Sequence, residues 1–301
     1  IRDVLGSRGL GDVYKRQTAT IGYDHLDIEY LKRAHITWTN CPGCNANSVG
    51  QYIHSCLLLL EKEKGYDLSK TTVGLVGVGH VGHAVIEAIR PLGVQILLND
   101  PPQKEALRKA GKPHEFFLKM EELQEKCDII SFHTPLITKG PYPTFHLANK
   151  TFFNALKKQP IIINTSRGAV VDNTDVLQAL KDGIIRDAII DTWENEPNIN
   201  QELLNLIYIG TPHIAGYSAD GKANATRMAL TALCNHFHLP VTFQIRVPQL
   251  PEEELPEPNL TETERALVLY NPHTDSLKLK SHPTMFEELR GNYPLRREFI
   301  E

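Results

Sequence analysis

Short apolar runs alternate with longer stretches of helical spacing through the middle of the chain. Six runs rich in β-branched residues each lead into a polar turn, namely TTVGLVGVG, VQILLND, CDIISFHTP, PIIINTSRG, DAIIDTWE and LIYIGTPHI. Strands that alternate with helices indicate a parallel sheet that is covered on both faces. The pattern therefore predicts an α/β domain with a doubly wound parallel sheet over residues 65–216.

Helical patterns flank this domain on both sides. Residues 46–64 have helical spacing and stop at Gly65, which predicts a helix that links two domains. Residues 217–240 predict a returning helix, with Ser218 as its N-cap. After a linker rich in Pro and Glu, we expect residues 248–301 to form a separate C-terminal domain.

The two ends of the chain differ from its middle. SRGLGDVYKRQ at residues 7–17 resembles translated adapter sequence from a sequencing library, so we expect residues 1–17 to be a non-native leader. Residues 18–45 are then the remnant of a substrate domain. The chain stops at Glu301 without a capping signal, and we expect the C-terminal domain to be truncated there.

Composition and charge exclude several classes of protein. The formal net charge is −4 and there is no long basic run, which argues against nucleic-acid binding. Purely apolar runs such as residues 57–60 are too short to cross a bilayer. Five cysteines, an odd number, fit reduced thiols better than a disulfide framework. We therefore expect a cytoplasmic protein that binds neither nucleic acid nor membrane.

A glycine-rich turn follows the first apolar run of the sheet. G-x-G-x-x-G between a strand and a helix is typical of a Rossmann-type dinucleotide site, where helix N–H groups bind the pyrophosphate. The expected backbone contacts are Gly77, Gly79, His80, Val81 and Gly82. Asp100 ends the next strand, where a carboxylate would bind ribose hydroxyls and repel a 2′-phosphate, so NAD is favoured over NADP. The alternative interpretation is a structural turn, with Asp100 as a helix cap.

Three polar residues each come just after a run of the sheet. Arg167, Glu196 and His213 can converge because the carboxyl ends of parallel strands meet at one edge. His213 could accept a hydroxyl proton, Glu196 could orient and stabilise its ring, and Arg167 could bind a carboxylate. This trio suits the oxidation of a 2-hydroxy acid. Taken singly, each residue would more often be an ordinary loop residue.

The same segments resemble one enzyme family. VGLVGVGHVG, LNDPP, FHTPL, IINTSRGAVVDN, DTWENEPNIN and GTPHIAGYSADGKANATRM are similar to motifs of the D-isomer-specific 2-hydroxyacid dehydrogenases, and the likeness runs from residue 18 to 301. PGCNA, the paired prolines after Asp100 and HIAGYSADGKA match one branch of that family most closely. The resemblance implies NAD-dependent oxidation of 4-phospho-D-erythronate in pyridoxal 5′-phosphate biosynthesis.

The resemblance also implies roles for individual residues. It makes Arg167, Glu196 and His213 the catalytic residues, with His213 as the proton carrier. It places Thr134, Thr165, Asp191 and Gly216 near the cofactor, and Thr20 and Tyr217 at the substrate. It makes residues 248–301 part of a dimerisation domain, so that the expected assembly is a homodimer. Groups that bind the substrate phosphate are expected in a segment before residue 18.

Other interpretations of the sequence remain open. Cys41-Pro-Gly-Cys44 has redox-like or zinc-like spacing, but no second Cys or His pair follows at ligand distance, so we interpret it as a loop and expect no metal. A related dehydrogenase that acts on phosphoglycerate, glyoxylate or hydroxypyruvate would carry the same chemistry. An NAD(H)-sensing module without turnover would share the fold.

Overall fold

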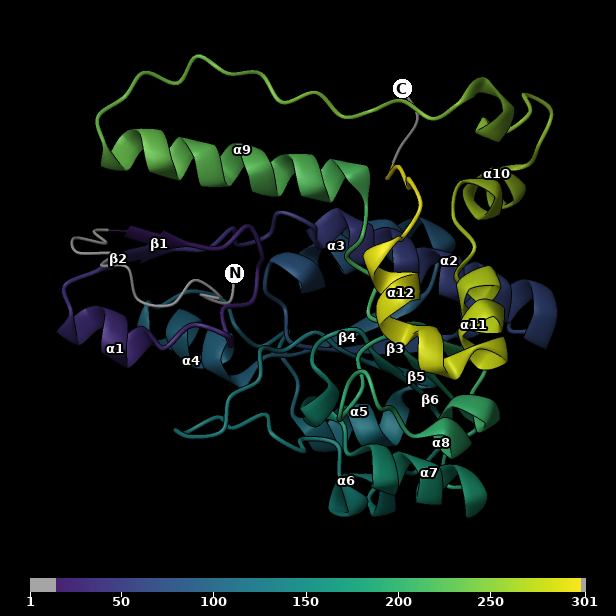
Figure 1. Ribbon diagram of the computed structural model, residues 1–301. Coiled ribbons are helices and arrows are strands. Elements are labelled where there is room, and N and C mark those ends of the chain that lie inside the picture. Colours follow the sequence, from purple (N-terminus) through teal and green to yellow (C-terminus); the bar gives the residue numbers. More distant parts are fainter. Residues whose placement is uncertain (1–14, 299–301) are drawn as a thin grey trace. The chain divides into compact units, whose positions relative to one another are not determined.

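The computed structural model describes residues 15–298 and divides the chain into two compact units (Figure 1). Unit 1 comprises Ile1–Cys44 and Lys222–Arg246. Unit 2 comprises Asn45–Gly221 and Val247–Glu301 and contains the whole parallel sheet.

Unit 1 is small, and two short parallel strands, β1 (Lys15–Gln17) and β2 (Thr37–Thr39), form its sheet. It also contains α1 (Ile28–Arg33) and most of α9 (Ala219–His236). The buried side chains of Cys41, Cys44 and Ala225 form its apolar cluster. The last three residues of the predicted leader thus form β1, and residues 1–14 lie outside the described part of the chain.

Six parallel strands form the sheet of unit 2 in the order β4-β3-β5-β6-β7-β8. They are β3 (Thr72–Val76), β4 (Gln95–Asn99), β5 (Ile129–Phe132), β6 (Ile161–Asn164), β7 (Asp187–Ile190) and β8 (Ile209–Gly210). Each of the six apolar runs in the sequence supplies one strand, so the predicted doubly wound sheet is confirmed. From β3 the chain continues to β4 at one edge of the sheet, and from β5 it continues to β6 in the opposite direction. The strand order therefore reverses between β3 and β5, and ligands bind at such a switch point in open α/β sheets.

Alternate residues of each strand enter two different apolar cores. Ile161 and Ile163 of β6 pack on one face of the sheet, and Ile162 packs on the other. On the first face lie α2 (Ala46–Lys64) and α3 (His80–Ile89); the second face is covered by α5 (Met120–Lys126), α6 (Lys150–Asn154), α7 (Asn173–Lys181) and α8 (Gln201–Leu206) (Figure 1). Because both faces are covered, the central strands are continuously apolar.

Two helix ends follow the sequence signals for them. The helix α2 stops at Gly65, which adopts φ 71°, a left-handed conformation that glycine takes without strain. At the start of α9 the Ser218 hydroxyl accepts a hydrogen bond of 2.8 Å from the backbone N of Gly221, as an N-cap does. Both predicted signals are therefore confirmed.

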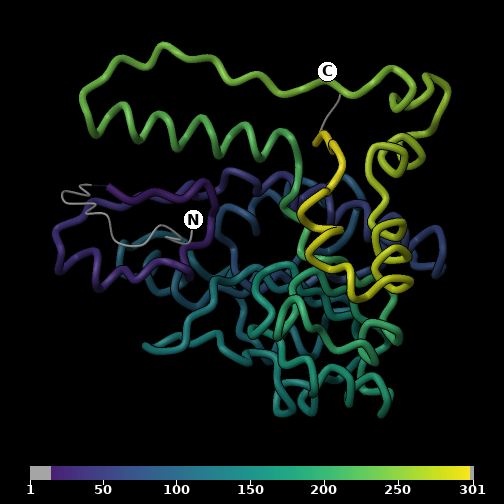
Figure 2. Tube along the Cα trace, in the orientation of Figure 1, coloured from purple at the N-terminus to yellow at the C-terminus, as the bar shows by residue number. Residues whose placement is uncertain are grey.

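The C-terminal helices belong to unit 2 and are coloured yellow-green to yellow in Figure 2. They are α10 (Glu262–Leu269), α11 (Pro272–Ser281) and α12 (Phe286–Gly291). The remaining helix of unit 2, α4 (Pro101–Lys109), follows β4. Tyr270 is buried in the first core, and Leu279 and Phe286 are buried in the second. Residues that the sequence assigned to a separate C-terminal domain thus contribute to the cores around the sheet, and their part in a dimer stays a prediction.

Candidate active site

The glycine-rich turn after β3 has the geometry that a dinucleotide site requires. Gly77 adopts φ 90°, and a Cβ there would lie 2.8 Å from the backbone oxygen of His133. A Cβ at Gly82 would meet the carbonyl of Gly77, whereas Gly79, the N-cap of α3, has open space beside its Cα. Packing therefore requires the first and third glycines, and the second leaves room for a ligand at the helix N-terminus.

Asp100 connects this turn to the neighbouring helix. Its carboxylate accepts hydrogen bonds of 2.8 Å from Val78 N in the turn and 2.9 Å from Gln103 N in α4. The helix cap that the sequence offered as an alternative is therefore present. His80 and Val81 form the first turn of α3, where N–H groups have no partner within the helix. Contacts of these residues with ribose or pyrophosphate stay predictions.

The carboxyl ends of the parallel strands lie along one edge of the sheet, which we call the rim. Side chains after β5 and β6 complete the part of the rim that faces the expected cofactor. Nε2 of buried His133 lies 2.9 Å from Ser131 Oγ, and its Nδ1 lies 3.2 Å from Thr165 Oγ1. Thr134 packs beside Gly77, and its buried Oγ1 has no hydrogen-bond partner between residues 15 and 298. Because a buried hydroxyl without a partner is unfavourable, Thr134 suits a polar ligand at the turn. The residues present thus fit a dinucleotide.

His133 is expected to make folding sensitive to acid. Burial lowers its pKa to about 3, so the folded protein keeps the ring neutral at pH values where the unfolded chain protonates it. The free energy of unfolding should therefore fall as the pH drops below about 6.5, with a slope for this group approaching about 1.4 kcal/mol per pH unit. Urea unfolding at pH 7 and 5.5 tests this. The difference between the two pH values should shrink in His133→Asn, and an unchanged difference would contradict the argument.

His213 and Glu196 form a direct hydrogen-bonded pair. His213 follows β8 and its Nδ1 lies 2.9 Å and 3.1 Å from the two carboxylate oxygens of Glu196, which follows β7. Burial alone would raise the pKa of Glu196, but the hydrogen bond and charge of His213, the N–H of Trp193 and the charge of Arg290 lower it below its usual value. An ionised carboxylate only accepts hydrogen bonds, so Nδ1 carries the proton and the Nε2 lone pair of a neutral ring is free to act as a base.

Asp191 fixes the loop that carries His213. It is 1% exposed, and its carboxylate accepts hydrogen bonds from Thr211 Oγ1 (2.6 Å), Ile214 N (2.7 Å) and Ala215 N (3.0 Å). Burial raises the pKa of Asp191, and the charge of His213 and these hydrogen bonds oppose that rise. His213 sits within this loop at φ 57°. Asp191 therefore acts on the loop backbone, and its predicted contact with the cofactor stays a prediction.

Arg167 lies on the adjoining loop, after β6. The Asn164 side chain donates 3.0 Å to the Arg167 carbonyl, and Arg167 Nη1 donates 2.7 Å to the carbonyl of Ser166. The next residue, Gly168, packs directly against the backbone of Trp193, whose N–H donates to Glu196. The loops after β6 and β7 are therefore in contact, so the structure brings Arg167 into the same rim as the His213–Glu196 pair.

Gly216 and Tyr217 end the loop after His213. Asn45 Nδ2 donates 3.1 Å to the Gly216 carbonyl, and its amide occupies the place that a Cβ at Gly216 would take. The Tyr217 hydroxyl accepts a hydrogen bond of 3.2 Å from Nε of Arg290 in α12. The same guanidinium lies 3.9 Å from Glu196 through Nη1. Tyr217 is therefore close to the predicted catalytic pair.

The C-terminal segment binds the same loop from its other side. Arg296 is 3% exposed, stacks 4.1 Å from the Tyr270 ring, and donates to the carbonyls of Ile214 (3.3 Å) and Ala215 (2.7 Å). Glu298 accepts hydrogen bonds from Ser48 and Ser218 at 2.7 Å and 2.8 Å. The loop after His213 is thus held through its N–H groups by Asp191 and through its carbonyls by Arg296.

Sequence reasoning missed Arg290, Arg296 and Glu298. Arg296 and Glu298 belong to the conspicuous RRE triplet at 296–298, but neither periodicity nor spacing indicates that these side chains reach loops about eighty residues earlier. Arg290 is one charged residue on a short helix and carries no signal of its own.

Three other residues that the sequence analysis discussed, Thr20, Cys41 and Cys44, belong to unit 1. Thr20 belongs to unit 1, where its hydroxyl donates 2.7 Å to the Gly22 carbonyl, and its contact with substrate stays a prediction. Cys41 and Cys44 are buried and form no disulfide, and burial raises the pKa of Cys41. Between residues 15 and 298 there is no group of three or more His, Cys, Asp or Glu residues able to hold a metal ion.

Two glycine substitutions should separate folding from cofactor binding. Gly82→Ala places a Cβ against the Gly77 carbonyl and should lower the free energy of unfolding by about 1–3 kcal/mol. Gly79→Ala meets open space, so the free energy of unfolding should change by less than about 0.5 kcal/mol. The new methyl group should instead weaken NADH binding. Thermal unfolding and NADH fluorescence titration of both variants test this, and normal NADH affinity in Gly79→Ala would refute the assignment.

Comparison with known proteins places the chain in a family. Residues 57–215 match the family described as "D-isomer specific 2-hydroxyacid dehydrogenase, NAD binding domain". The chain is 52% identical over 281 residues to an erythronate-4-phosphate dehydrogenase of Bacteroides fragilis, an alignment that covers 93% of this chain and 79% of that protein. The protein of the same name from Porphyromonas gingivalis is 42% identical over 95% of this chain and 78% of its own length.

Solved structures agree on the fold. A D-lactate dehydrogenase from Aquifex aeolicus, complexed with NAD and lactic acid, superposes with a TM-score of 0.63 at 23% identity, covering 74% of this chain and 76% of that one. An NAD-dependent formate dehydrogenase from Staphylococcus aureus gives 0.62 at 22% identity, covering 76% and 73%. The chain therefore belongs to the D-isomer specific 2-hydroxyacid dehydrogenase family, among the relatives named erythronate-4-phosphate dehydrogenase.

Proposed function

We propose that the protein oxidises 4-phospho-D-erythronate to 3-hydroxy-2-oxo-4-phosphooxybutanoate with NAD, a step of pyridoxal 5′-phosphate biosynthesis. The hydrogen-bonded pair of His213 and Glu196 carries the proposal, because it gives the family's chemistry a base with a free Nε2. The choice of substrate is supported by the relatives that share this sequence at 42–52% identity.

The residues of the rim divide the reaction between them. His213 Nε2 accepts the proton of the C2 hydroxyl as the hydride leaves the same carbon, which becomes the carbonyl carbon. Glu196 stabilises the imidazolium that forms, and Asp191 and Arg296 keep the ring's loop in place. Arg167 holds the substrate carboxylate through its planar fork of donors.

The glycine-rich turn and Thr134 would hold NAD next to this rim. NAD bound there supplies the acceptor for the hydride. Gly79 gives the pyrophosphate room at the start of α3, and the unpaired hydroxyl of Thr134 gains a partner. Asp100, close to the turn through Val78, supplies the negative charge that would disfavour a 2′-phosphate.

The assembly we propose is a homodimer formed through residues 248–301. Leu255, Val268 and Leu277 of this segment are each more than 40% exposed, which supports an apolar contact surface there. Light scattering of the purified protein should give twice the mass of one chain.

A cytoplasmic location is also part of the proposal. None of the five cysteines, all of them within residues 15–298, forms a disulfide, as a reducing compartment favours. No helix within residues 15–298 is long and apolar enough to span a membrane.

NADH formation with 4-phosphoerythronate, 3-phosphoglycerate and glycerate, measured side by side on the full-length protein, tests the proposal. We expect a clear preference for 4-phosphoerythronate. A preference for another acid would keep the chemistry and cofactor but reject the substrate. NADH binding without turnover of any of these acids would instead indicate a sensing module.

A further inference from the structure

Arg290 brings a cation from the C-terminal segment to the candidate active site. Its Nε donates 3.2 Å to the hydroxyl of Tyr217, and its guanidinium carbon lies 5.9 Å from the centre of that ring. Its Nη1 lies 3.9 Å from Glu196, which itself bonds to His213 at 2.9 Å. Glu196 is therefore the one residue between the guanidinium of Arg290 and the proposed base, His213.

Most of the donors on this guanidinium are unused. The bond from Nε to Tyr217 is its one hydrogen bond among the described residues, and the 3.9 Å contact with Glu196 is beyond hydrogen-bond distance. The two carboxylate oxygens of Glu196 already accept bonds from His213 and Trp193. The side chain of Arg290 is 29% exposed, and its Nη groups make no hydrogen bond among the described residues, although Nη1 forms a long ion pair with Glu196.

The proposed substrate has two anionic groups, a carboxylate and a phosphate. Arg167 is assigned to the carboxylate, so a second cation close to the reacting carbon is available for the phosphate, in addition to the groups expected before residue 18. A guanidinium binds phosphate oxygens through paired N–H groups. We propose that Arg290 binds the phosphate monoester of the substrate with its Nη groups, while Tyr217 holds it in place through Nε. This inference rests on the proposed function, and it names a group that makes the site select phosphorylated acids.

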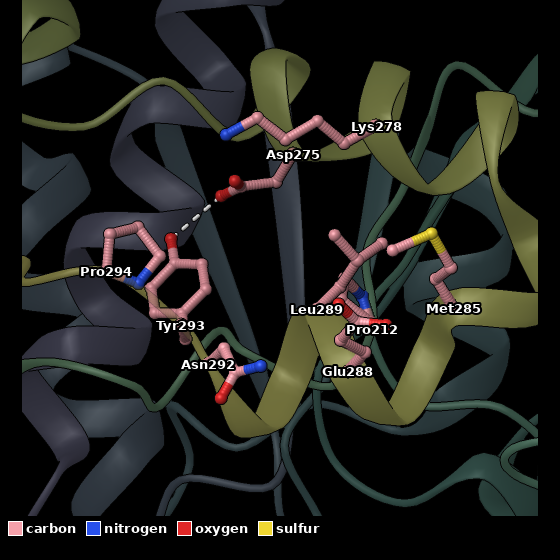
Figure 3. A pocket seen from close by; sticks show the side chains of 9 residues that line it. All are labelled: Pro212, Asp275, Lys278, Met285, Glu288, Leu289, Asn292, Tyr293 and Pro294. Carbon is pink, nitrogen blue, oxygen red and sulfur yellow. Dashed lines mark hydrogen bonds between the residues drawn. The ribbon is translucent and has the colours of Figure 1, made fainter.

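A cavity on the neighbouring face of α12 does not suit the phosphate. It has a volume of about 180 Å³ and lies next to Pro212 (Figure 3). Two carboxylates, Asp275 and Glu288, line it against one cation, Lys278, and Tyr293 donates 2.8 Å to Asp275. Excess negative charge there repels a phosphate dianion. Lys278 is exposed and makes no hydrogen bond or ion pair with Tyr217 or Glu196, so it offers a matched control.

The test compares 4-phosphoerythronate with erythronate, which lacks the phosphate. In Arg290→Gln, kcat/KM for 4-phosphoerythronate should fall by about 10- to 100-fold, the range for a charge-assisted hydrogen bond. The value for erythronate should change by less than about threefold, and NADH affinity should stay the same. Inorganic phosphate should inhibit the unaltered protein competitively and the variant at least tenfold more weakly. Arg290→Lys should recover part of the loss, and Lys278→Gln should behave as the unaltered protein.

Other outcomes would overturn one proposal or the other. If the unaltered protein does not prefer 4-phosphoerythronate to erythronate, the proposed substrate is wrong. If it does prefer it, but Arg290→Gln loses the same factor with both acids, Arg290 acts through Glu196 or Tyr217 and does not bind phosphate. The same loss in Lys278→Gln would place the phosphate in the cavity of Figure 3.

Discussion

His213→Asn should lower kcat by about 10²- to 10⁴-fold, the range of general acid–base catalysis. Asparagine suits this position because His213 adopts φ 57°, a left-handed conformation that asparagine tolerates better than most residues. The backbone bonds of the loop to Asp191 should therefore survive. Without the imidazole, nothing on the loop accepts the hydroxyl proton. Steady-state NADH formation measures kcat, and fluorescence titration measures the Kd of NADH.

The NADH measurement separates chemistry from folding. The Kd of NADH should stay within about twofold of the unaltered value, because the glycine-rich turn that is expected to bind NADH precedes α3 and is separate from the loop of His213. His114→Asn, on an exposed turn after α4, serves as the matched control and should leave both values unchanged. An equal loss of NADH binding in His213→Asn, or nearly normal turnover, would reject His213 as the base.

Arg296→Met should produce the largest loss of stability. The guanidinium is buried and donates to the carbonyls of Ile214, Ala215 and Ser48, so its removal leaves three carbonyls without that donor. A loss of about 2–4 kcal/mol in the free energy of unfolding is expected, because each buried acceptor left unpaired costs about 1–3 kcal/mol and some of them will find water. Methionine keeps an unbranched apolar stem, although it lacks the guanidinium that stacks on Tyr270. Urea unfolding followed by the fluorescence of the two tryptophans, of which Trp193 is buried at 3% exposure, measures this.

Activity under folded conditions gives a second readout. At a temperature where Arg296→Met is fully folded, kcat should fall more than KM changes, because the loop that carries His213 is looser while Arg167 is untouched. Arg265→Met, on exposed α10, removes the same charge without touching the loop and should change neither stability nor kcat. Unfolding of Arg296→Met at the same urea concentration as Arg265→Met would contradict the stabilising role of Arg296 in holding the His213 loop.

The sheet was predictable because its information is local. Each strand of unit 2 comes from one apolar run with a polar turn after it, and the turn chemistry of Gly77 and Gly82 is visible in the spacing of the glycines. The pair of Glu196 and His213 was also within reach, because both follow strands whose carboxyl ends share an edge.

Contacts between residues distant in the sequence could not be predicted, because no local pattern marks them. Arg290 and Arg296 lie on short or irregular segments without periodicity, and the residues that accept their hydrogen bonds are 73 to 248 residues earlier in the chain. Nothing in the composition of FEELRGNYPLRREF tells a surface arginine from a buried one. Asp100 illustrates a third case, since the sequence offered a helix cap and a cofactor ligand as alternatives, and the cap that the structure contains leaves the second role untested.

The hydrogen bonds from Arg296 to the His213 loop have a consequence for the order in which the fold forms during synthesis. Arg296 leaves the ribosome 82 residues after Ile214, the residue whose carbonyl it binds. At roughly 5–20 residues per second, the nascent chain waits about 4–16 s between the synthesis of the loop and the arrival of its last fixing group. All six strands of the sheet and the glycine-rich turn are complete before that interval begins. The strands of the dinucleotide fold are thus synthesised before the RRE triplet, whose Arg296 binds the loop of the proposed base.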